Sequence, residues 1–493
     1  MRKLRELFSD SLIYGISNVL ARFINYLLVP FYTDVFSTAL YGIVGLVYAA
    51  ITFLNVVFTF GMESAYLRYA ENRKAAANIF KTIQLSLLGF SAILCLLLWL
   101  LMPWLLHQFN LGPGNSGIFL LMLGIVWFDT LGIVPLAELR LVRKTIPFAA
   151  LKFVHVIINL SLNFYLILES NYGIEAVFIA NLSASVFVTL VVWVLTADLF
   201  KGTWSSDWMK KIVQFGWPFV PAGIGFAINE VLDRFFLNNM DPAVATQLYG
   251  SNITPEDIVG IYNACYKLAV FMLLLVQMYR MAWQPFFMRH ADDEESPKVF
   301  GQAFIWYNAF SALLFLTVAL FKEQIVAIEV PVLNATLIGS DYWLGLEIVP
   351  YLLLAYWFHG WYINFSSGVF IKEKTRILYK ITLMGAAITI IANLALIPSF
   401  GMIGSASATL LSYGAMATTL GIYSKKIMHV PYRLPESFGL MVIFAALVFG
   451  EATISAWLGI GWIATKSLIV AFSLIVISLY LWVLVHFGES SEN

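Results

Sequence analysis

The sequence predicts an all-α polytopic membrane protein with about 14 transmembrane helices. The chain of 493 residues is 60% hydrophobic and only 12% charged, and its mean hydropathy of +0.83 lies above the range of soluble globular proteins. Apolar runs of about 20 residues, the length that crosses a bilayer core of ~30 Å, follow one another along the whole chain. The gaps between them are too short to hold an extramembrane domain.

The expected spans are separated by charged breaks or by breaks rich in Gly, Pro and Asn. They cover residues 9–33, 40–66, 82–106, 117–138, 146–169, 174–197, 212–238, 257–287, 299–321, 343–369, 376–398, 402–424, 435–454 and 464–487. If the N-terminus is cytoplasmic, the cytoplasmic segments hold 21 of the Lys and Arg residues and the opposite segments hold two. Because cytoplasmic loops carry an excess of cations, we expect both termini to be cytoplasmic.

Composition and motifs exclude several classes of function. The 29 Lys and Arg residues are balanced by 29 Asp and Glu residues, so no basic field exists to bind nucleic acid. The sequence contains no phosphate-binding loop, no metal-ligand cluster and no nucleophile–base pair. We therefore expect neither an enzyme nor an ATPase, and no resident metal or cofactor.

A faint internal repeat predicts two lobes. Tyr41-Gly42-Ile43 in the second expected span corresponds to Val259-Gly260-Ile261 in the eighth, and residues 163–176 match residues 393–404. Both halves start on the same side of the membrane, so we expect two parallel six-helix lobes followed by two extra C-terminal spans. These three parts are residues 1–205, 206–430 and 431–493.

Polar side chains at helical spacing predict a hydrophilic cavity inside the membrane. A charged side chain at bilayer depth costs at least ~2.5–3.5 kcal/mol, so it should face a cavity or a partner rather than lipid. In four spans such side chains recur on one helical face. The candidate cavity residues are Asn18, Arg22, Asn25, Asn55, Lys152, His155, Asn159, Asn263, Lys267 and Arg280. For the lone amides, hydrogen bonding between packed helices is an equal interpretation.

Acidic residues are candidates for a coupling or gating role. Glu63 and Asp129 lie away from the expected outer rim and could balance the cations across the cavity. Glu230 and Arg234 are four residues apart, which is the spacing of a local ion pair on a helix, and Asp233 lies beside them. These acids are compatible with transport that is coupled to H+ or Na+. They are also compatible with transport driven by the membrane potential alone.

The mixture of cations and amides favours an anionic substrate that carries hydroxyl groups. Arg and Lys side chains can bind a diphosphate, and Asn and Gln side chains can exchange hydrogen bonds with sugar hydroxyls. The pattern therefore indicates a phosphorylated glycolipid.

Three local strings resemble a known family. They are Tyr14-Gly15 through Pro30-Phe31-Tyr32-Thr33, Phe215-Gly216-Trp217-Pro218 ending in Asp233-Arg234-Phe235, and Asn393-Leu394-Ala395-Leu396-Ile397-Pro398 to Gly401. Together they look like the polysaccharide transporter (Wzx-like) flippases of the multidrug/oligosaccharidyl-lipid/polysaccharide (MOP) exporter superfamily. The resemblance covers essentially the whole chain, in order.

This resemblance implies a MATE-like fold and a bacterial inner-membrane flippase. Such a protein moves undecaprenyl-diphosphate-linked oligosaccharide, the repeat unit of a polysaccharide or O-antigen, from the cytoplasmic to the periplasmic leaflet by alternating access. It also implies the polysaccharide polymerase or export machinery as further partners. By position, Arg22 and Asp233-Arg234 match cavity or motif positions of the family. Lys152, Lys267 and Arg280 rest on spacing alone.

Three alternatives stay open at this stage. A flippase for lipid II, the peptidoglycan precursor, would share the superfamily, the number of spans and a basic cavity. A MATE-type cation-coupled multidrug exporter would use an acidic cavity, for which Glu63, Asp129 and Glu230 could supply the acids. A non-transporting scaffold for polysaccharide synthesis would pack the polar stripes against one another and leave no cavity.

Overall fold

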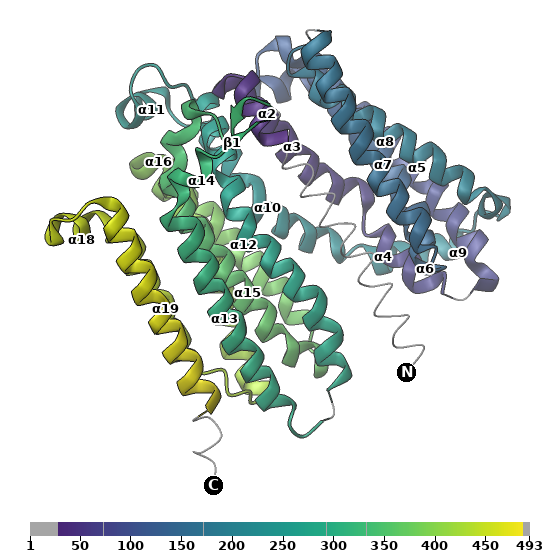
Figure 1. The fold of residues 1–493 in the computed structure, drawn as a ribbon. Helices are drawn as coiled ribbons and strands as arrows, with labels where there is room; N and C mark the ends of the chain where they lie inside the picture. The colour runs from purple at the N-terminus through teal and green to yellow at the C-terminus, as the bar shows by residue number, and fades with distance from the viewer. Residues whose placement is uncertain (1–27, 72, 171, 292, 332, 487–493) are drawn as a thin grey trace. The chain divides into compact units, whose positions relative to one another are not determined.

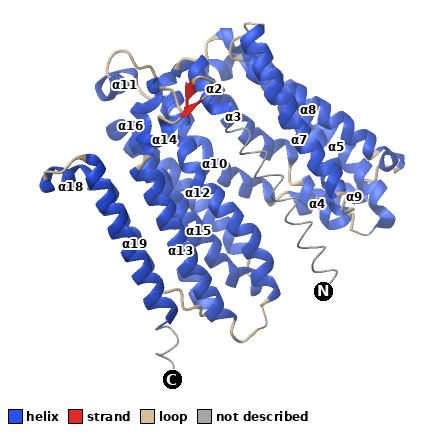
Figure 2. Ribbon diagram, viewed as in Figure 1, coloured by secondary structure: helices blue, strands red, loops and turns tan. Residues whose placement is uncertain are grey.

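The computed structural model describes residues 28–71, 73–170, 172–291, 293–331 and 333–486, and most of these residues are helical (Figures 1 and 2). The first expected span lies outside the described residues except for its end, and so do Asn18, Arg22 and Asn25. The chain forms two compact units, Met1–Asn263 and Ala264–Asn493. The boundary between these two units does not test the expected repeat, so the division into six-helix lobes stays a prediction.

The first unit is a helical bundle. Its elements are α2 (Leu28–Val35), α3 (Thr38–Thr59), α4 (Met62–Tyr69), η1 (Arg73–Ala75), α5 (Ala76–Gln108), η2 (Pro113–Asn115), α6 (Ser116–Leu141), α7 (Thr145–Phe164), η3 (Tyr165–Glu169), α8 (Glu175–Leu195), η4 (Ala197–Lys201), α9 (Ser206–Gly216), α10 (Phe219–Asn238), α11 (Pro242–Tyr249) and the start of α12 (Pro255–Arg289). Helix α6 packs against α3, α5 and α8, and α8 also packs against α7.

Small residues bring α6 and α8 close together. A Cβ atom on Gly132 would lie 2.8 Å from the hydroxyl oxygen of Thr189, and that hydroxyl donates to the backbone oxygen of Phe128 at 2.9 Å. In a membrane, lipid tails are as apolar as Leu, so helices associate through close packing and interhelical hydrogen bonds. This contact is of that kind, and it holds together two helices that line the site described below.

Two expected spans of the first unit are broken rather than continuous. Helix α3 ends at Thr59 because Phe60 and Gly61 both adopt positive φ angles, 48° and 69°, which no α-helix continues. Helices α9 and α10 are separated at Trp217-Pro218, where proline removes a backbone donor. Residues beyond each break therefore leave the helical face that sequence spacing assigned to them.

The second unit holds the rest of α12 and the elements that follow. They are α13 (Ser296–Leu320), α14 (Lys322–Val326), β1 (Glu329–Val330), β2 (Ala335–Thr336), η5 (Ser340–Ile348), α15 (Val349–Ile371), α16 (Arg376–Ile427), α17 (Leu434–Phe449), α18 (Glu451–Leu458) and α19 (Trp462–His486). The two strands pair antiparallel. Helix α15 packs along α16 and against α13, and α17 and α19 pack against α13.

Buried polar side chains tie the second unit together. The amide oxygen of Asn308 on α13 accepts from the indole nitrogens of Trp357 and Trp361 on α15, at 2.8 and 2.7 Å. The ammonium of Lys466 on α19 donates to Gln324 on α14 at 3.1 Å and lies 3.7 Å from the carboxylate of Glu451. The C-terminal helices are thus joined to the unit by a buried charge as well as by apolar packing.

The described helices account for the expected spans from the second onward. Ten of them are long and apolar enough to cross a membrane, or eleven when α17 and α18, which meet at a bend of 61°, count as one span. Helix α16, 52 residues long, holds two expected spans joined at Gly401, whose φ of 53° and ψ of −126° are non-helical. Helix α15 is 23 residues long and is not among the eleven, because its Trp, Tyr, His and Asn residues lower its hydropathy.

Two glycines that the repeat aligned meet each other in the first unit. A Cβ atom on Gly42 of α3 would lie 3.1 Å from the backbone nitrogen of Gly260 on α12 and would overlap the carbonyl oxygen of Glu256. A Cβ atom on Gly260 would lie 2.9 Å from the backbone nitrogen of Gly42 and would overlap the carbonyl oxygen of Thr38. The two backbones therefore touch at a point where no side chain fits.

We expect Gly42→Ala to destabilise the protein by about 1–3 kcal/mol, the usual cost of overpacking. The midpoint of thermal unfolding of the detergent-purified chain measures the effect. Gly89→Ala on α5 is the matched control, since nothing lies within 4 Å of its added methyl group and alanine favours helix. An unchanged midpoint in Gly42→Ala would show that the two backbones can separate at no cost.

Candidate functional site

A polar cavity of about 570 Å³ lies within the first unit, between α3, α6, α7 and α8. Its polar and charged lining residues are Tyr48, Asn55, Thr59, Asp129, Lys152, His155, Asn181, Ser185 and Thr189. The volume falls within the range of about 300–1,000 Å³ that is usual for small-molecule sites. Charged side chains within membrane-spanning helices are expected to mark a functional pathway.

Asp129 and Lys152 supply the two opposite charges of this cavity. Asp129 projects from α6 and Lys152 from α7, and their charges attract each other across it. Within the described part of the chain, the ammonium of Lys152 makes no hydrogen bond and no ion pair closer than 4 Å. It therefore keeps its three donors available for an anionic ligand.

Amide and hydroxyl groups surround this pair. The side-chain oxygen of Asn55 is buried and accepts no hydrogen bond from any described residue. Asn181 donates to the hydroxyl of Tyr48 at 2.9 Å, and the Nε2 atom of His155 lies 3.4 Å from the hydroxyl of Ser185. The cavity thus offers a cation, an acid and an unused acceptor, which suits a ligand with both charge and hydroxyl groups.

The structure brings together four residues that sequence spacing selected: Asn55, Lys152, His155 and Asp129. Asn159 lies on the same helix as Lys152 but belongs to a packed network instead. Its side-chain oxygen accepts from Asn163 at 2.8 Å, and Asn163 accepts from the hydroxyl of Tyr32 at 2.7 Å. This is the helix–helix hydrogen bonding that was the equal interpretation for lone amides.

The remaining candidates on α12 lie elsewhere. Asn263 is buried against α3, where its side chain would be 3.2 Å from a Cβ atom on Gly45. Lys267 and Arg280 belong to the second unit, the first half-buried and the second exposed. A role for these two cations in substrate binding stays a prediction.

The acids predicted for coupling or gating have separate environments. Glu63 forms an ion pair with Arg140 on α6, because the break after Thr59 places it on α4 rather than on the α3 face that lines the cavity. On α10, Arg234 pairs with Asp233 at 2.6 Å and also donates to the backbone oxygen of Glu230. The other carboxylate oxygen of Asp233 accepts from Tyr262 at 2.7 Å.

Another buried acid, Glu138, joins α4 and η1 to α6. Its two carboxylate oxygens accept from both terminal nitrogens of Arg73, at 2.5 and 2.9 Å, and one also accepts from the hydroxyl of Tyr66 at 2.7 Å. A bidentate pair of this kind is among the stronger hydrogen-bonded contacts in proteins. It anchors the helices at the C-terminal end of α6, two residues past the lining residue Leu136.

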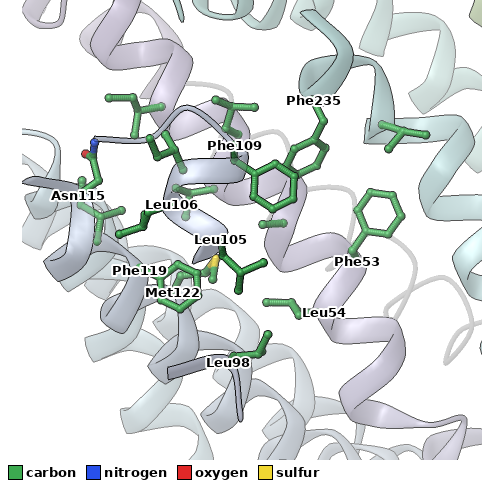
Figure 3. Close-up of a pocket in the computed structure, with 17 residues that line it drawn as sticks. Phe53, Leu54, Leu98, Leu105, Leu106, Phe109, Asn115, Phe119, Met122 and Phe235 are labelled. Carbon is green, nitrogen blue, oxygen red and sulfur yellow. The ribbon is translucent and has the colours of Figure 1, made fainter. Parts of the chain in front are cut away.

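An apolar cavity of about 330 Å³ lies next to the polar one, between α3, α5, α6 and α10. Of the 17 residues that line it, Asn115 alone is polar. Figure 3 shows Phe109 and Phe235 side by side at one end, with Leu98 and Met122 at another; the ring centroids of the two phenylalanines are 5.1 Å apart. Asn115 supplies the one hydrogen-bonding side chain among these lining residues.

The polar residues that α8 contributes to the polar cavity were not predicted from the sequence. Asn181, Ser185 and Thr189 recur at every fourth position, so one face of this span is polar. That spacing was available but contains no charge, and uncharged stripes are common in packed bundles. Among the described residues, no group of three or more His, Cys, Asp or Glu side chains could hold a metal ion.

Long apolar helices around a charged internal cavity define the class: this is a multi-pass membrane protein. Residues 7–291, more than half of the chain, match the family model described as "Polysaccharide biosynthesis protein". The chain therefore belongs to the polysaccharide biosynthesis protein family. No curated protein sequence matches it.

Solved structures of the MATE-like fold resemble the chain throughout. The lipid II flippase MurJ in an inward closed conformation has a TM-score of 0.69 at 14% identity, covering 96% of this chain and 98% of its own. A multidrug resistance MATE family transporter of the MOP superfamily, inward-facing, has a TM-score of 0.62 at 14% identity, covering 81% and 93%. A mutant of the Vibrio cholerae MATE transporter VcmN has a TM-score of 0.55 at 15% identity, covering 86% and 96%. These likenesses confirm the predicted fold class.

Tyr66→Phe is expected to destabilise the protein by roughly 1–3 kcal/mol, because the buried carboxylate of Glu138 loses a hydrogen bond. The thermal midpoint in detergent measures the loss. Tyr69→Phe on the same helix is the control, since the hydroxyl of Tyr69 makes no hydrogen bond with any described residue. Equal midpoints for the two variants would contradict an anchoring role for the contact with Glu138.

Proposed function

We propose that this protein is a flippase for an undecaprenyl-diphosphate-linked oligosaccharide. It would carry the repeat unit of a polysaccharide or O-antigen from the cytoplasmic to the periplasmic leaflet of the bacterial inner membrane by alternating access, with both termini in the cytoplasm. The observation that carries the proposal is the ammonium of Lys152, which faces a polar cavity beside an unused amide acceptor. Membership of the polysaccharide biosynthesis family supports it, as does the fold shared with a lipid II flippase.

Each lining group has a role in this proposal. Lys152 neutralises the diphosphate, since a charge-assisted hydrogen bond to phosphate is shorter and stronger than a neutral one. The oxygen of Asn55 accepts a hydrogen bond from a sugar hydroxyl, and Asn181 and Ser185 provide further polar contacts. Arg22, Lys267 and Arg280 are proposed to bind the diphosphate at other stages of its passage. A polysaccharide polymerase or export assembly would receive the product.

Lys152→Ala should reduce polymer export at least tenfold in a flippase-deficient strain, because a hydrogen bond to a charged group contributes about 1.5–3 kcal/mol. Export is read from the surface polymer at matched levels of the flippase in the membrane. Lys144→Ala, in the exposed turn before α7, removes a cation of the same type outside the cavity and should leave export unchanged. Full rescue by Lys152→Ala would remove Lys152 from the substrate site.

We also propose that Asp129 couples transport to a cation. The ammonium of Lys152 attracts its carboxylate across the cavity. A bound diphosphate competes for that ammonium, so the carboxylate then gains a cation, either H+ or Na+, to remain neutralised. Binding of the anion and of the cation are linked in this way, and the linkage acts in both directions.

Asp129→Asn is expected to keep substrate affinity within about twofold of the wild type while transport becomes insensitive to an imposed pH or Na+ gradient. Transport in proteoliposomes under each gradient measures this. Asp198→Asn, at an exposed carboxylate in η4, should respond to the gradient as the wild type does. A gradient response that survives in Asp129→Asn would assign coupling to another group.

Ligand-induced stabilisation separates this proposal from its alternatives, because binding to the folded state raises the melting point. The purified chain is heated with undecaprenyl diphosphate, with lipid II and with a panel of cationic drugs. Stabilisation by undecaprenyl diphosphate that is lost in Lys152→Ala supports the proposed flippase. Preferential stabilisation by lipid II would indicate a peptidoglycan precursor flippase, and stabilisation by cationic drugs alone would indicate a multidrug exporter.

A further inference from the structure

We propose that the apolar cavity between α3, α5, α6 and α10 holds the first isoprene units of the substrate's polyprenyl chain while the diphosphate occupies the polar cavity. This inference rests on the proposed function and adds a second part to its binding site. The protein would then bind the part of the lipid chain next to the head group, and only the rest of the chain would remain in the bilayer.

The apolar lining suits a hydrocarbon chain. Sixteen of its 17 residues are apolar, and the labelled side chains in Figure 3 other than Asn115 present only carbon and one sulfur atom to the space. An apolar cavity of this kind stays dry and takes up apolar molecules. Its walls gain dispersion contacts only when hydrocarbon fills the space.

Helix α6 runs from the apolar cavity into the polar one along a single face. Ile118 and Met122 line the apolar cavity, and Ile125, Asp129 and Leu136 line the polar one. These positions follow one another at alternating steps of three and four residues, with position 132 completing the series, so they form one stripe along the helix. Met122 and Ile125 are one turn apart, which places the two cavities end to end.

Helix α3 separates the two cavities and lines both. Val47, Ala50 and Leu54 line the apolar cavity, and each is followed in the sequence by a residue that lines the polar cavity. Neighbouring positions on an α-helix point about 100° apart, so the two linings occupy adjacent sides of α3. In the proposed complex, the charged head and the apolar chain of one ligand occupy these two spaces on either side of α3.

The position of the polar cavity identifies the occupant as the substrate's own chain. A bulk phospholipid keeps its head group at the membrane interface, whereas the head-group site that adjoins this cavity lies inside the bundle. On a scale of about 30 Å³ for a group the size of water, 330 Å³ holds roughly ten carbon atoms, or about two isoprene units. The cavity thus fits the start of the chain rather than its whole length.

The test compares isopentenyl diphosphate and geranyl diphosphate, which share a head group and carry one and two isoprene units. Binding to the full-length purified chain is followed by thermal stabilisation across a concentration series. We expect geranyl diphosphate to bind at least about tenfold more tightly, since each methylene group removed from water contributes a gain of roughly fourfold. Ala50→Trp, which fills the cavity from α3, should bring this ratio close to one, because neither chain can then enter the apolar cavity.

Ala92→Trp, the same substitution at an exposed position of α5, is the matched control and should keep the wild-type ratio. A wild-type ratio near one, or a ratio that survives in Ala50→Trp, would overturn the inference. Should Ala50→Trp fail to fold, a photoactivatable geranyl diphosphate gives the same answer on the unaltered chain. Label on peptides containing residues 43–54 and 98–122, displaced by undecaprenyl diphosphate, supports the inference, whereas label elsewhere contradicts it.

The outcomes also separate this inference from the function on which it rests. If undecaprenyl diphosphate binds and depends on Lys152 while chain length has no effect, the flippase proposal stands and the chain site fails. If none of the three diphosphates binds, both fail together. Label at the lining residues that phospholipid displaces and undecaprenyl diphosphate does not would assign the cavity to bulk lipid.

Discussion

The cost of leaving a charge unpaired in hydrocarbon is the constraint on which the rest of this structure depends. Each buried acid described here has a partner: Glu138 accepts from Arg73 and Tyr66, and Asp233 accepts from Arg234. Lys152 differs because its ammonium makes no ion pair closer than 4 Å with a described residue, although Asp129 faces it across the cavity. A buried cation that makes no close ion pair with any described residue is a sound reason to look for a ligand at that point.

The fold was largely predictable because a membrane allows few solutions. Backbone groups in hydrocarbon must be satisfied within a helix, so long apolar runs and their charged breaks define the architecture. Local backbone geometry was less accessible. The break at Phe60-Gly61 depends on left-handed conformations that a phenylalanine rarely adopts, and no pattern of hydropathy reports it.

The site, like the fold, could be predicted only in part from the sequence. Helical spacing placed Lys152 and His155 on one face, and the cavity that both residues line also contains Asn55 and Asp129 from other helices. Spacing did not show that Asn159 turns to Asn163, because residues on one broad helical face can still meet different neighbours. Helical spacing also could not show which polar helical faces lie next to each other, because that depends on packing between helices far apart in the sequence. Helical spacing could not predict the apolar cavity, because leucines that line a cavity and leucines that face lipid follow the same sequence pattern.

The contact between Gly42 and Gly260 has a consequence for how related sequences can diverge. Most pairs of packed residues can change during evolution through compensating substitutions, in which one side chain becomes smaller and its neighbour becomes larger. Here each position already has the smallest residue, and backbone atoms occupy the space on both sides. Neither partner can yield volume to the other, so no compensating exchange exists. In an alignment of close relatives, this contact would appear as two unchanging columns and would escape any method that detects contacts through correlated substitution.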